Sequence, residues 1–290
     1  MAKTYRKYPI KMLYRMAYLL LCKSDNCNEL VTKSYDHISA GYDQAWTSHM
    51  RDLTTSLIFK LNLKQGDKAI DLACGTGFAT NLIAEKTGEK AIGVDRSEGM
   101  LKEAEKNYGQ SCDFVNVDIV EYLKGTDSNS MDIITCCWGL GYSKPFVLLK
   151  QIKRILKPGG KVAIIDNSLF SLREIIYCSF LTFMEQPEKL VNLMWFRFLT
   201  GSFHLNILFR MLSMKPVYLT NGSRSYIVES GPSAIEKLRV TGAAAGFEYA
   251  ANQQDQETIF KRFAQIIEEK YMSDDGINII HRYLAGIAQK

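Results

Sequence analysis

The sequence lacks the cysteine patterns that would indicate a metal site or a disulfide framework. Its seven cysteines lie at positions 22, 27, 74, 112, 136, 137 and 178, without paired CxxC spacing and without the histidine partners of a zinc site. We therefore expect no bound metal. An odd number of cysteines with no regular spacing favours reduced thiols in a cytoplasmic protein.

Long hydrophobic runs and low-complexity segments are also missing. The uncharged run Met16–Cys22 is far shorter than the roughly 20 residues that cross a bilayer. As a secretory signal its apolar core is too short, and Leu-Leu-Cys offers no small-residue cleavage site. A content of 47% hydrophobic and 23% charged residues is instead typical of one large globular α/β domain, or of a domain with an added lid.

An excess of positive charge is present only at the N-terminus. The formal net charge is +5, yet a group of basic residues precedes the first acidic residue, Asp25. These are Lys3, Arg6, Lys7, Lys11, Arg15 and Lys23. Without them the positive and negative side chains nearly balance, so we expect no broad basic face and no nucleic-acid partner.

The same N-terminal segment predicts an amphipathic helix. Between Tyr8 and Cys22, one helical face carries Ile10, Leu13, Tyr14, Ala17, Tyr18 and Leu21, with Lys11 and Arg15 away from it. Two roles suit such a helix. It could cap the mouth of an active site, which we favour, or attach residues 1–24 to an anionic membrane surface as a peripheral contact.

The central part of the sequence has the rhythm of an α/β fold. From residue 68 onward, short β-branched runs alternate with helical stretches, which predicts a doubly wound, mostly parallel sheet. The candidate strands are residues 68–73, 90–95, 113–117, 131–138 and 161–167. The candidate helices are residues 79–86, 98–108 and 144–156, and the last one ends at Lys157-Pro158-Gly159-Gly160.

After Asn167 this rhythm breaks. Residues 168–215 are rich in aromatic, leucine and methionine side chains at helical spacing, which predicts a helical insertion that acts as a substrate lid. The rhythm resumes with a helix at 232–244, a turn at Gly246 into a strand, and a last strand near 258–263. We thus expect an N-terminal helical cap (1–50), a Rossmann-like domain (51–167 and 216–265), the insertion (168–215) and a C-terminal helix (266–290).

A glycine turn marks a candidate nucleotide site. The strand that ends at Ala73 runs directly into Cys74-Gly75-Thr76-Gly77, and a helix follows. Glycine suits this position because the backbone must turn sharply and let a ligand approach with no side chain between. The N-terminus of the next helix also directs free N–H groups at that space.

Two acidic residues end the next two strands. Asp95 lies near the spacing, about 20 residues past the glycines, at which a carboxylate accepts hydrogen bonds from both hydroxyls of a ribose. Its other reading is a cap for the helix near Glu98, for which Ser97 is at least as suitable. Asp118 ends the third strand and could accept the adenine amino group while Ile119 packs on the ring; otherwise it is a solvated loop acid.

In this order and spacing, these motifs resemble those of class I S-adenosylmethionine-dependent methyltransferases. The resemblance rests on Asp71-Leu-Ala-Cys-Gly-Thr-Gly77, Asp95, Asp118 and Leu156-Lys-Pro-Gly-Gly160. Upstream, Tyr35-Asp-His-Ile-Ser-Ala-Gly-Tyr42-Asp43 is similar to a segment of small-molecule members, including the ubiquinone/menaquinone C-methyltransferase type. The resemblance covers about residues 34–166 and leaves the acceptor unidentified.

The resemblance implies a Rossmann-like, seven-stranded sheet with an antiparallel last strand, and S-adenosylmethionine as the cofactor. It implies that Tyr35 and Tyr42 lie over the cofactor, Asp71 and Gly75 near its methionine part, Asp95 on the ribose and Asp118 near the adenine. The candidate cofactor-binding residues are Tyr35, Tyr42, Asp71, Ala73, Gly75, Gly77, Asp95, Arg96, Met100, Asp118, Ile119 and Cys137.

A methyl group on sulfonium sulfur is already activated, so such an enzyme mainly has to align a nucleophile in a dry pocket. Where the acceptor is a hydroxyl or an acidic carbon, a base is needed as well. The candidate bases are His37 and His204, each of which has a structural role as its alternative. Tyr142 is a candidate residue that borders the acceptor, with a packing role as its alternative. The aromatic insertion suits a small hydrophobic acceptor that is prenylated, polyketide-like or indole-like; core packing or a homodimer interface would explain it equally well.

Three other functions are less consistent with the sequence. A nicotinamide-dependent oxidoreductase needs a third glycine or alanine, where this chain has Thr80. A nucleic-acid methyltransferase would show a basic face, and its adenine-modifying type an Asp/Asn-Pro-Pro-Tyr-like turn in place of Cys136-Cys-Trp-Gly139. A non-catalytic binding module would not need the intact glycines and both carboxylates.

Overall fold

The computed structural model describes residues 7–22 and 27–290, apart from the side chains of residues 44–49. Of the basic N-terminal residues, Lys3, Arg6 and Lys23 lie outside this part of the chain, as does Asp25. The chain forms two compact units. The sheet unit comprises Tyr35–Ser171, Phe196–Ser223 and Arg282–Lys290, and the helical unit comprises Met1–Ser34, Leu172–Trp195 and Arg224–His281.

The sheet unit contains the predicted alternation of strands and helices. Its elements are β1 (Ala69–Leu72), α3 (Phe78–Thr87), β2 (Ala91–Asp95), α4 (Glu98–Tyr108), β3 (Cys112–Asn116), α5 (Ile119–Gly125), β4 (Met131–Cys137), η2 (Leu140–Tyr142), α6 (Pro145–Ile155), β5 (Leu156–Asn167) and α8 (Ser202–Met211). Helix α2 (Cys27–Lys60) and the strands β6 (Lys215–Val228) and β8 (Gly276–Gln289) run through both units.

The strands are arranged in the order β3-β2-β1-β4-β5-β8-β6, with the two-residue β7 (Met272–Ser273) paired to β8 beside this path. Strands β1 to β5 pair in parallel. Strand β8 pairs antiparallel with β5, with Lys161 opposite Gln289 and Asn167 opposite Tyr283. The mostly parallel α/β sheet and its antiparallel strand at the end of the chain are therefore confirmed.

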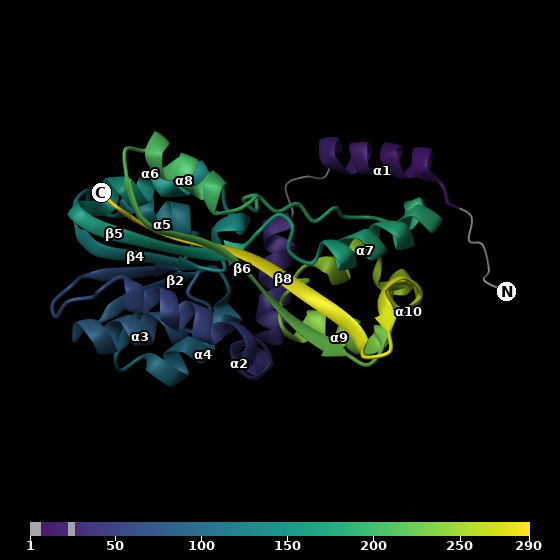
Figure 1. Cartoon of the computed structure of the whole chain (residues 1–290), viewed down its shortest axis with the longest axis horizontal. Coiled ribbons are helices and arrows are strands. Elements are labelled where there is room, and N and C mark those ends of the chain that lie inside the picture. The colour runs from purple at the N-terminus through teal and green to yellow at the C-terminus, as the bar shows by residue number, and fades with distance from the viewer. Residues whose placement is uncertain (1–6, 23–26) are drawn as a thin grey trace. The chain divides into compact units, whose positions relative to one another are not determined.

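Both faces of the sheet are buried, as its apolar strands predict. In β5, Val162 and Ile164 point into one core cluster, which includes side chains of α5, α6 and α8. Ala163 and Ile165 point into the opposite cluster, with side chains of α2 and α3. Figure 1 shows this layering, with α6 and α8 on one side of the strands and α3 and α4 on the other.

The helical unit is built from α1 (Pro9–Cys22), α7 (Arg173–Glu185), η3 (Pro187–Lys189), α9 (Gly231–Val240), η4 (Phe247–Ala250), α10 (Gln253–Tyr271) and β7. Its main core joins α7, α9 and α10 with the first part of β8, where Ile277 and Ile279 are buried. A smaller cluster holds α1 through Met12 and Leu19. No helix in the described part of the chain is long and apolar enough to cross a membrane.

The end of the chain differs from the sequence prediction. The predicted C-terminal helix (266–290) is wrong beyond Tyr271, because the chain continues as β7 and β8. The predicted strand near 258–263 lies inside α10, and Gly246 leads into the short helix η4. Asp275-Gly276 is a hairpin signal that marks the turn between β7 and β8. Gly276 has φ +106°, a value that side chains rarely adopt.

The predicted domain boundaries also differ from the two units. The insertion (168–215) does contain the helices α7 and α8, but the unit boundary between Trp195 and Phe196 separates them. Residues 224–265, which we assigned to the Rossmann-like domain, belong to the helical unit. The predicted cap (1–50) is divided at Ser34 in the middle of α2. Hydrophobic spacing shows that a segment is helical but not which neighbour it packs against.

Candidate active site

The glycine turn lies between β1 and α3, at the carboxyl ends of the parallel strands. Gly75 and Gly77 have φ values of +55° and +82°. A Cβ on Gly77 would lie 2.8 Å from the Phe114 ring, so this position needs glycine for space as well as for conformation. Around Gly75 no atom lies within 4 Å of an ideal Cβ, so its backbone faces open space. This exposed backbone is the surface that a ligand can approach.

Asp95 at the end of β2 closes one side of this space. Its Oδ2 accepts the Gly75 N–H at 2.8 Å, and its Oδ1 accepts the Ser97 N–H at 2.9 Å. Burial raises the pKa of Asp95, and these backbone donors oppose the shift. Each carboxylate oxygen keeps a lone pair for a further donor. Ser97, not Asp95, caps α4, where it accepts the Met100 N–H.

Asp71 has a different environment, although it is adjacent in sequence to the same turn. It is 1% exposed, and its two oxygens accept the hydroxyls of Thr80 at 2.8 Å and Thr135 at 2.6 Å. Burial raises the pKa of Asp71 to about 6. These bonds tie β1 to α3 and to β4, so Asp71 holds the strand ends together. Thr80, which breaks the dinucleotide pattern in the sequence, is one of its two partners.

Asp118 and Ile119 lie after β3, as predicted. Asp118 caps α5, because its Oδ1 accepts the N–H groups of Val120 at 2.9 Å and Glu121 at 3.0 Å. Its Oδ2 pairs with Arg96, which follows Asp95. Ile119 is 8% exposed. The structure therefore brings Arg96 and Asp118 together, and the predicted contact with an adenine stays a prediction.

The remaining predicted cofactor residues surround the same strand ends. Ala73, between β1 and the glycines, has φ +55° without being glycine. Met100 is buried in the first turn of α4. Cys137 ends β4, and burial raises the pKa of its thiol well above the ordinary value, so it stays protonated. The contact of these three residues with a cofactor stays a prediction.

Helix α2 is held over these strand ends by two carboxylates that the sequence reading did not single out. Asp36 accepts the Ser97 hydroxyl at 2.6 Å and the Gly99 N–H at 2.9 Å. Asp43 accepts the Thr76 hydroxyl at 2.6 Å. The two aspartates of the Tyr-Asp pairs thus fix α2 to the strand ends. The preceding residues, Tyr35 and Tyr42, therefore also lie near the strand ends.

These tyrosines form an aromatic cluster, which we define as Tyr35, Tyr42, Tyr142, Phe196 and Phe198. The hydroxyls of Tyr35 and Tyr142 are 2.9 Å apart, and the ring centroids of Tyr142 and Phe196 are 5.3 Å apart. Burial raises the pKa of Tyr35 to about 12 and those of Tyr42 and Tyr142 well above 10. All three phenols therefore keep their protons near neutral pH, and one of Tyr35 and Tyr142 donates its proton to the other.

Asp166 at the end of β5 supports this cluster and was missed from the sequence. Its Oδ2 accepts the Gly141 N–H at 2.6 Å, and its Oδ1 accepts the Asn167 N–H at 2.7 Å. It is 2% exposed, and burial raises its pKa to about 7. Asp166 thereby holds the turn that carries Tyr142. Its position at a strand end, like those of Asp95 and Asp118, is the signal that could have identified it.

The two candidate histidines are not in the aromatic cluster. His37 is exposed on α2, two residues after Tyr35, and side chains two positions apart point to different sides of a helix. His204 is half-buried on α8, whose buried side chains pack in the cluster with α5 and α6. Of the predicted catalytic residues, only Tyr142 lies beside predicted cofactor residues.

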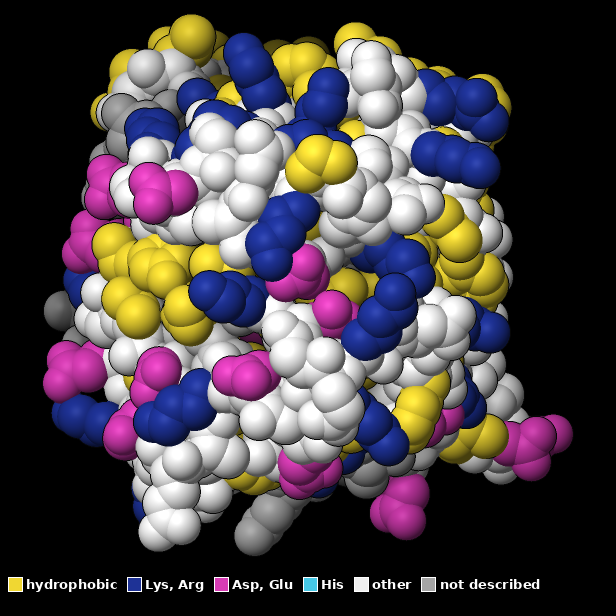
Figure 2. Space-filling view, turned by 90° about the vertical axis from the view of Figure 1, so that its left-hand side faces the viewer, with side chains coloured by type: hydrophobic (Ala, Val, Ile, Leu, Met, Phe, Trp, Pro, Cys, Tyr) yellow, Lys and Arg dark blue, Asp and Glu magenta, His cyan; other side chains and the backbone are white. Residues whose placement is uncertain are grey.

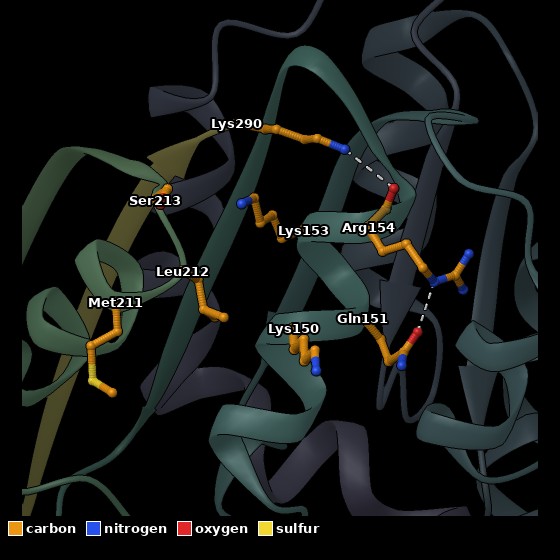
Figure 3. A pocket seen from close by; sticks show the side chains of 8 residues that line it. All are labelled: Lys150, Gln151, Lys153, Arg154, Met211, Leu212, Ser213 and Lys290. Carbon is orange, nitrogen blue, oxygen red and sulfur yellow. Dashed lines mark hydrogen bonds between the residues drawn. The ribbon is translucent and has the colours of Figure 1, made fainter.

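A separate pocket lies near the start of β5, away from the strand ends that carry the glycine turn. Lys290 follows β8, and its backbone is hydrogen-bonded to Gly159 and Gly160 near the start of β5. Asp166 of the strand-end site lies near the other end of β5. Figure 3 shows the side chains that line the pocket: Lys150, Gln151, Lys153, Arg154, Met211, Leu212, Ser213 and Lys290. The Lys290 ammonium donates to the Arg154 carbonyl at 3.2 Å. This basic pocket is therefore no part of the strand-end site.

Comparison with known proteins gives a consistent family. Residues 69–160 match the model of a family described as "Methyltransferase domain". The chain is 31% identical over 178 residues to the demethylmenaquinone methyltransferase of Geobacillus stearothermophilus, covering 56% of this chain and 75% of the relative. The matched family region contains the glycine turn, Asp95 and Asp118.

Solved structures share the fold at lower identity. The YcgJ protein from Bacillus subtilis has a TM-score of 0.56 and 14% identity, covering 82% of this chain and 97% of that one. Phosphoethanolamine N-methyltransferase 2 of Haemonchus contortus, in complex with S-adenosyl-L-methionine, has a TM-score of 0.55 and 18% identity, covering 88% and 57%. These likenesses support the arrangement of strands and helices.

Proposed function

The chain belongs to the class I S-adenosylmethionine-dependent methyltransferases of the menaquinone C-methyltransferase type, and from this premise we propose that it methylates a ring carbon of a small apolar quinol. The observation that carries the proposal is the aromatic cluster, whose protonated phenols lie at the same strand ends as Asp95. The matched relative named demethylmenaquinone methyltransferase supports the choice of a quinol ring.

The residues around the glycine turn fit S-adenosylmethionine, which supplies a methyl group on a positively charged sulfur. Asp95 retains one lone pair on each oxygen and would accept both ribose hydroxyl protons. The backbone of Gly75 faces open space. Asp71 would act indirectly, because it is only 1% exposed and its oxygens bind the hydroxyls of Thr80 and Thr135.

Protonated tyrosines suit a quinol acceptor. One of the hydroxyls of Tyr35 and Tyr142 donates to the other, and the hydroxyl that accepts this bond would donate its own proton to an oxygen on the acceptor ring and fix its orientation. When that oxygen has lost its proton to water, the adjacent ring carbon becomes the nucleophile. The new bond joins this carbon to the methyl group, and the sulfur keeps the electron pair of the broken bond. The proton on the ring carbon then passes to water, which restores the aromatic ring. Asp166 is a positioning residue that holds Tyr142 for this contact.

The test is methylation of a panel of acceptors by the full chain with isotopically labelled S-adenosylmethionine. The panel contains a naphthoquinol with a free ring carbon and a short isoprenoid tail, a simple phenol and an indole. We expect label on the naphthoquinol ring carbon, located by mass spectrometry and NMR. Methylation of an oxygen, or preferential methylation of the phenol or the indole, would contradict the proposed acceptor.

A further inference from the structure

Helix α1 leaves its predicted apolar face uncovered. Ile10 is 81% exposed, Leu13 65%, Tyr14 78% and Leu21 85%. These residues lie at the helical spacing that the sequence showed, so they form one continuous stripe. The helical unit does not cover this stripe, and a contiguous exposed apolar surface of this kind marks a binding site.

The opposite side of α1 fixes the helix to the helical unit. Met12 and Leu19 are buried in a cluster with Phe183 and Leu190. The Arg15 guanidinium donates to the Leu190 carbonyl at 2.7 Å, and the Tyr8 N–H donates to the Met184 carbonyl at 2.9 Å. In Figure 1, α1 lies along α7. The apolar stripe thus belongs to a docked helix, and its outward direction is set by packing.

Charge on α1 has one sign only. Its sequence, from Pro9 to Cys22, contains Lys11 and Arg15 and no acidic residue. Lys7 precedes the helix and, like Lys11, is exposed. Aromatic rings accompany these cations, since the Lys11 ammonium lies 4.8 Å from the centre of the Tyr8 ring. Cations and tyrosines beside an apolar stripe suit the boundary between phosphate headgroups and acyl chains.

We propose that α1 docks the protein on an anionic lipid bilayer, with the stripe Ile10, Leu13, Tyr14 and Leu21 inserted and Lys7 and Lys11 at the phosphates. A second copy of this chain, packed α1 against α1, would bury the same stripe. It would offer no acidic side chain of α1 to Lys7 and Lys11, because the helix contains none. If the acceptor is the proposed apolar quinol, docking would bring the enzyme to an acceptor dissolved in the bilayer. This last point rests on the proposed function.

The first experiment is sedimentation of the full chain with vesicles of phosphatidylcholine alone or mixed with phosphatidylglycerol. We expect binding to the mixed vesicles that weakens as salt is raised. Lys7→Glu combined with Lys11→Glu should weaken vesicle binding by about 25-fold or more, because each cation near an anionic surface strengthens binding roughly fivefold.

A charge-matched control separates this surface from general electrostatics. Lys150→Glu with Lys153→Glu changes the net charge by the same amount, in the basic pocket of the sheet unit (Figure 3). Figure 2 shows a face of the molecule on which basic side chains are spread among acidic and apolar ones. We expect this control to bind vesicles within about twofold of the original chain, because these two cations are not part of α1 and flank no apolar stripe that enters the acyl region.

The apolar part is tested with Ile10→Gln combined with Leu21→Gln. Both side chains are more than four-fifths exposed, so the helix has no packing to lose. We expect vesicle binding at least about tenfold weaker, because two side chains no longer enter the acyl region. The matched control is Phe203→Gln with Met211→Gln on α8, which are 74% and 65% exposed. It should leave binding unchanged.

Three results would overturn the proposal. The first is vesicle binding that the α1 and the α8 variants weaken equally, and the second is vesicle binding that does not need the anionic lipid. The third is self-association in ultracentrifugation that Ile10→Gln with Leu21→Gln abolishes.

Methylation of a tail-less, water-soluble quinol is measured in parallel. It should be unchanged in the α1 variants, and its loss would favour the cap instead. Failure of this soluble reaction in the unaltered chain would count against the proposed acceptor but not against docking.

Discussion

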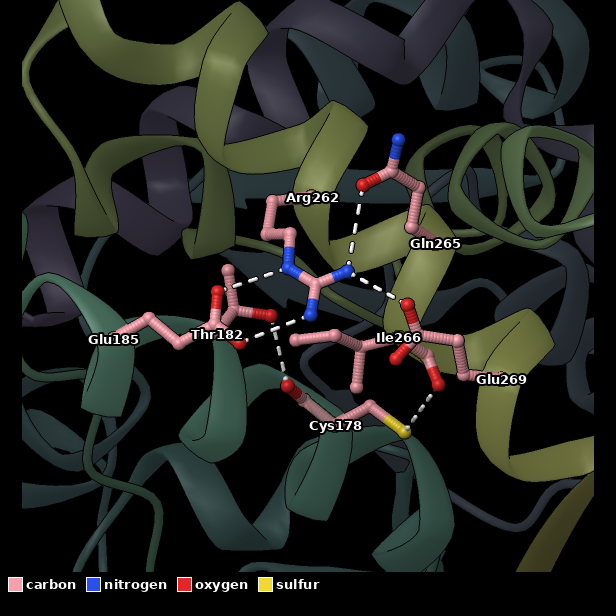
Figure 4. Close-up of polar contacts among 7 residues, drawn as sticks. All are labelled: Cys178, Thr182, Glu185, Arg262, Gln265, Ile266 and Glu269. Carbon is pink, nitrogen blue, oxygen red and sulfur yellow. Dashed lines mark hydrogen bonds and ion pairs between the residues drawn. The ribbon is translucent and has the colours of Figure 1, made fainter. Parts of the chain in front are cut away.

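The two units differ in the partners of their buried charged side chains: an opposite charge in the helical unit, and neutral hydrogen-bond donors in the sheet unit. In the helical unit, Arg262 of α10 forms a closed network, with Nε and Nη2 each 2.8–2.9 Å from a carboxylate oxygen of Glu185 and Nη1 2.9 Å from Glu269 (Figure 4). In the sheet unit, the buried Asp71 and Asp166 and the half-buried Asp95 accept hydrogen bonds from hydroxyl and N–H donors. An ion-paired group has its charge compensated within the protein, whereas a carboxylate held by neutral donors keeps its capacity for a proton and, where it is only half-buried as in Asp95, for a ligand.

The largest effect is expected where the closed network is broken. Glu185→Ala leaves the Arg262 guanidinium largely buried with Glu269 as its remaining carboxylate. We expect the free energy of unfolding to fall by about 3 kcal/mol, measured by urea denaturation. Glu29→Ala, which removes an exposed pair with Lys33, is the control and should leave stability unchanged. Equal effects of the two variants would contradict a structural role for the network.

The next comparison concerns pH. The pKa of Asp166 is raised to about 7 in the folded protein, from an ordinary value of 3.8. The folded state therefore binds this proton more tightly than the unfolded state, and stability falls as pH rises from about 4 to about 7, by at most about 1.4 kcal/mol per pH unit for this group. Asp166→Asn should flatten this decline in urea denaturation across that range. An unchanged slope would show that Asp166 is not buried in protonated form.

A smaller effect is expected for the open carboxylate of the site. Asp95→Ala should lower the affinity for S-adenosylmethionine by about 10- to 100-fold, because one or two charge-assisted hydrogen bonds are lost. Calorimetric titration measures this directly. Asp113→Ala is the control, since Asp113 is exposed on β3 and pairs with Lys90. Unchanged affinity in a folded Asp95→Ala protein would refute the ribose contact.

The smallest effect is expected from removing one hydroxyl. Tyr142→Phe keeps the ring in the aromatic cluster but removes its hydrogen bond with Tyr35. We expect turnover of the naphthoquinol to fall by about fivefold, with cofactor affinity unchanged, because one neutral hydrogen bond contributes about 1 kcal/mol. A matching loss of cofactor affinity would place Tyr142 on the nucleoside side of the site.

The order of short strands, the glycine turn and the acid after β2 followed from the sequence, because each depends on neighbours within one strand-turn-helix segment. Gly77 could be predicted in this way, since it needs a positive φ and space beside Phe114. The long strand β8 could not, because its pairing partner β5 is more than a hundred residues away. The hairpin signal at Asp275-Gly276 was present, but the isoleucine-rich segment that follows also fits a helix.

By itself the sequence determined the parallel sheet, the place of the glycine turn and the amphipathic character of α1, all of which are local patterns of residue type. Only the tertiary structure decided that Asp166 supports Tyr142, that Asp36 and Asp43 hold α2 over the strand ends, and that the apolar face of α1 is turned outward. These outcomes depend on which distant segment supplies the packing partner or the hydrogen-bond donor. Hydrophobic period and residue spacing carry no such information.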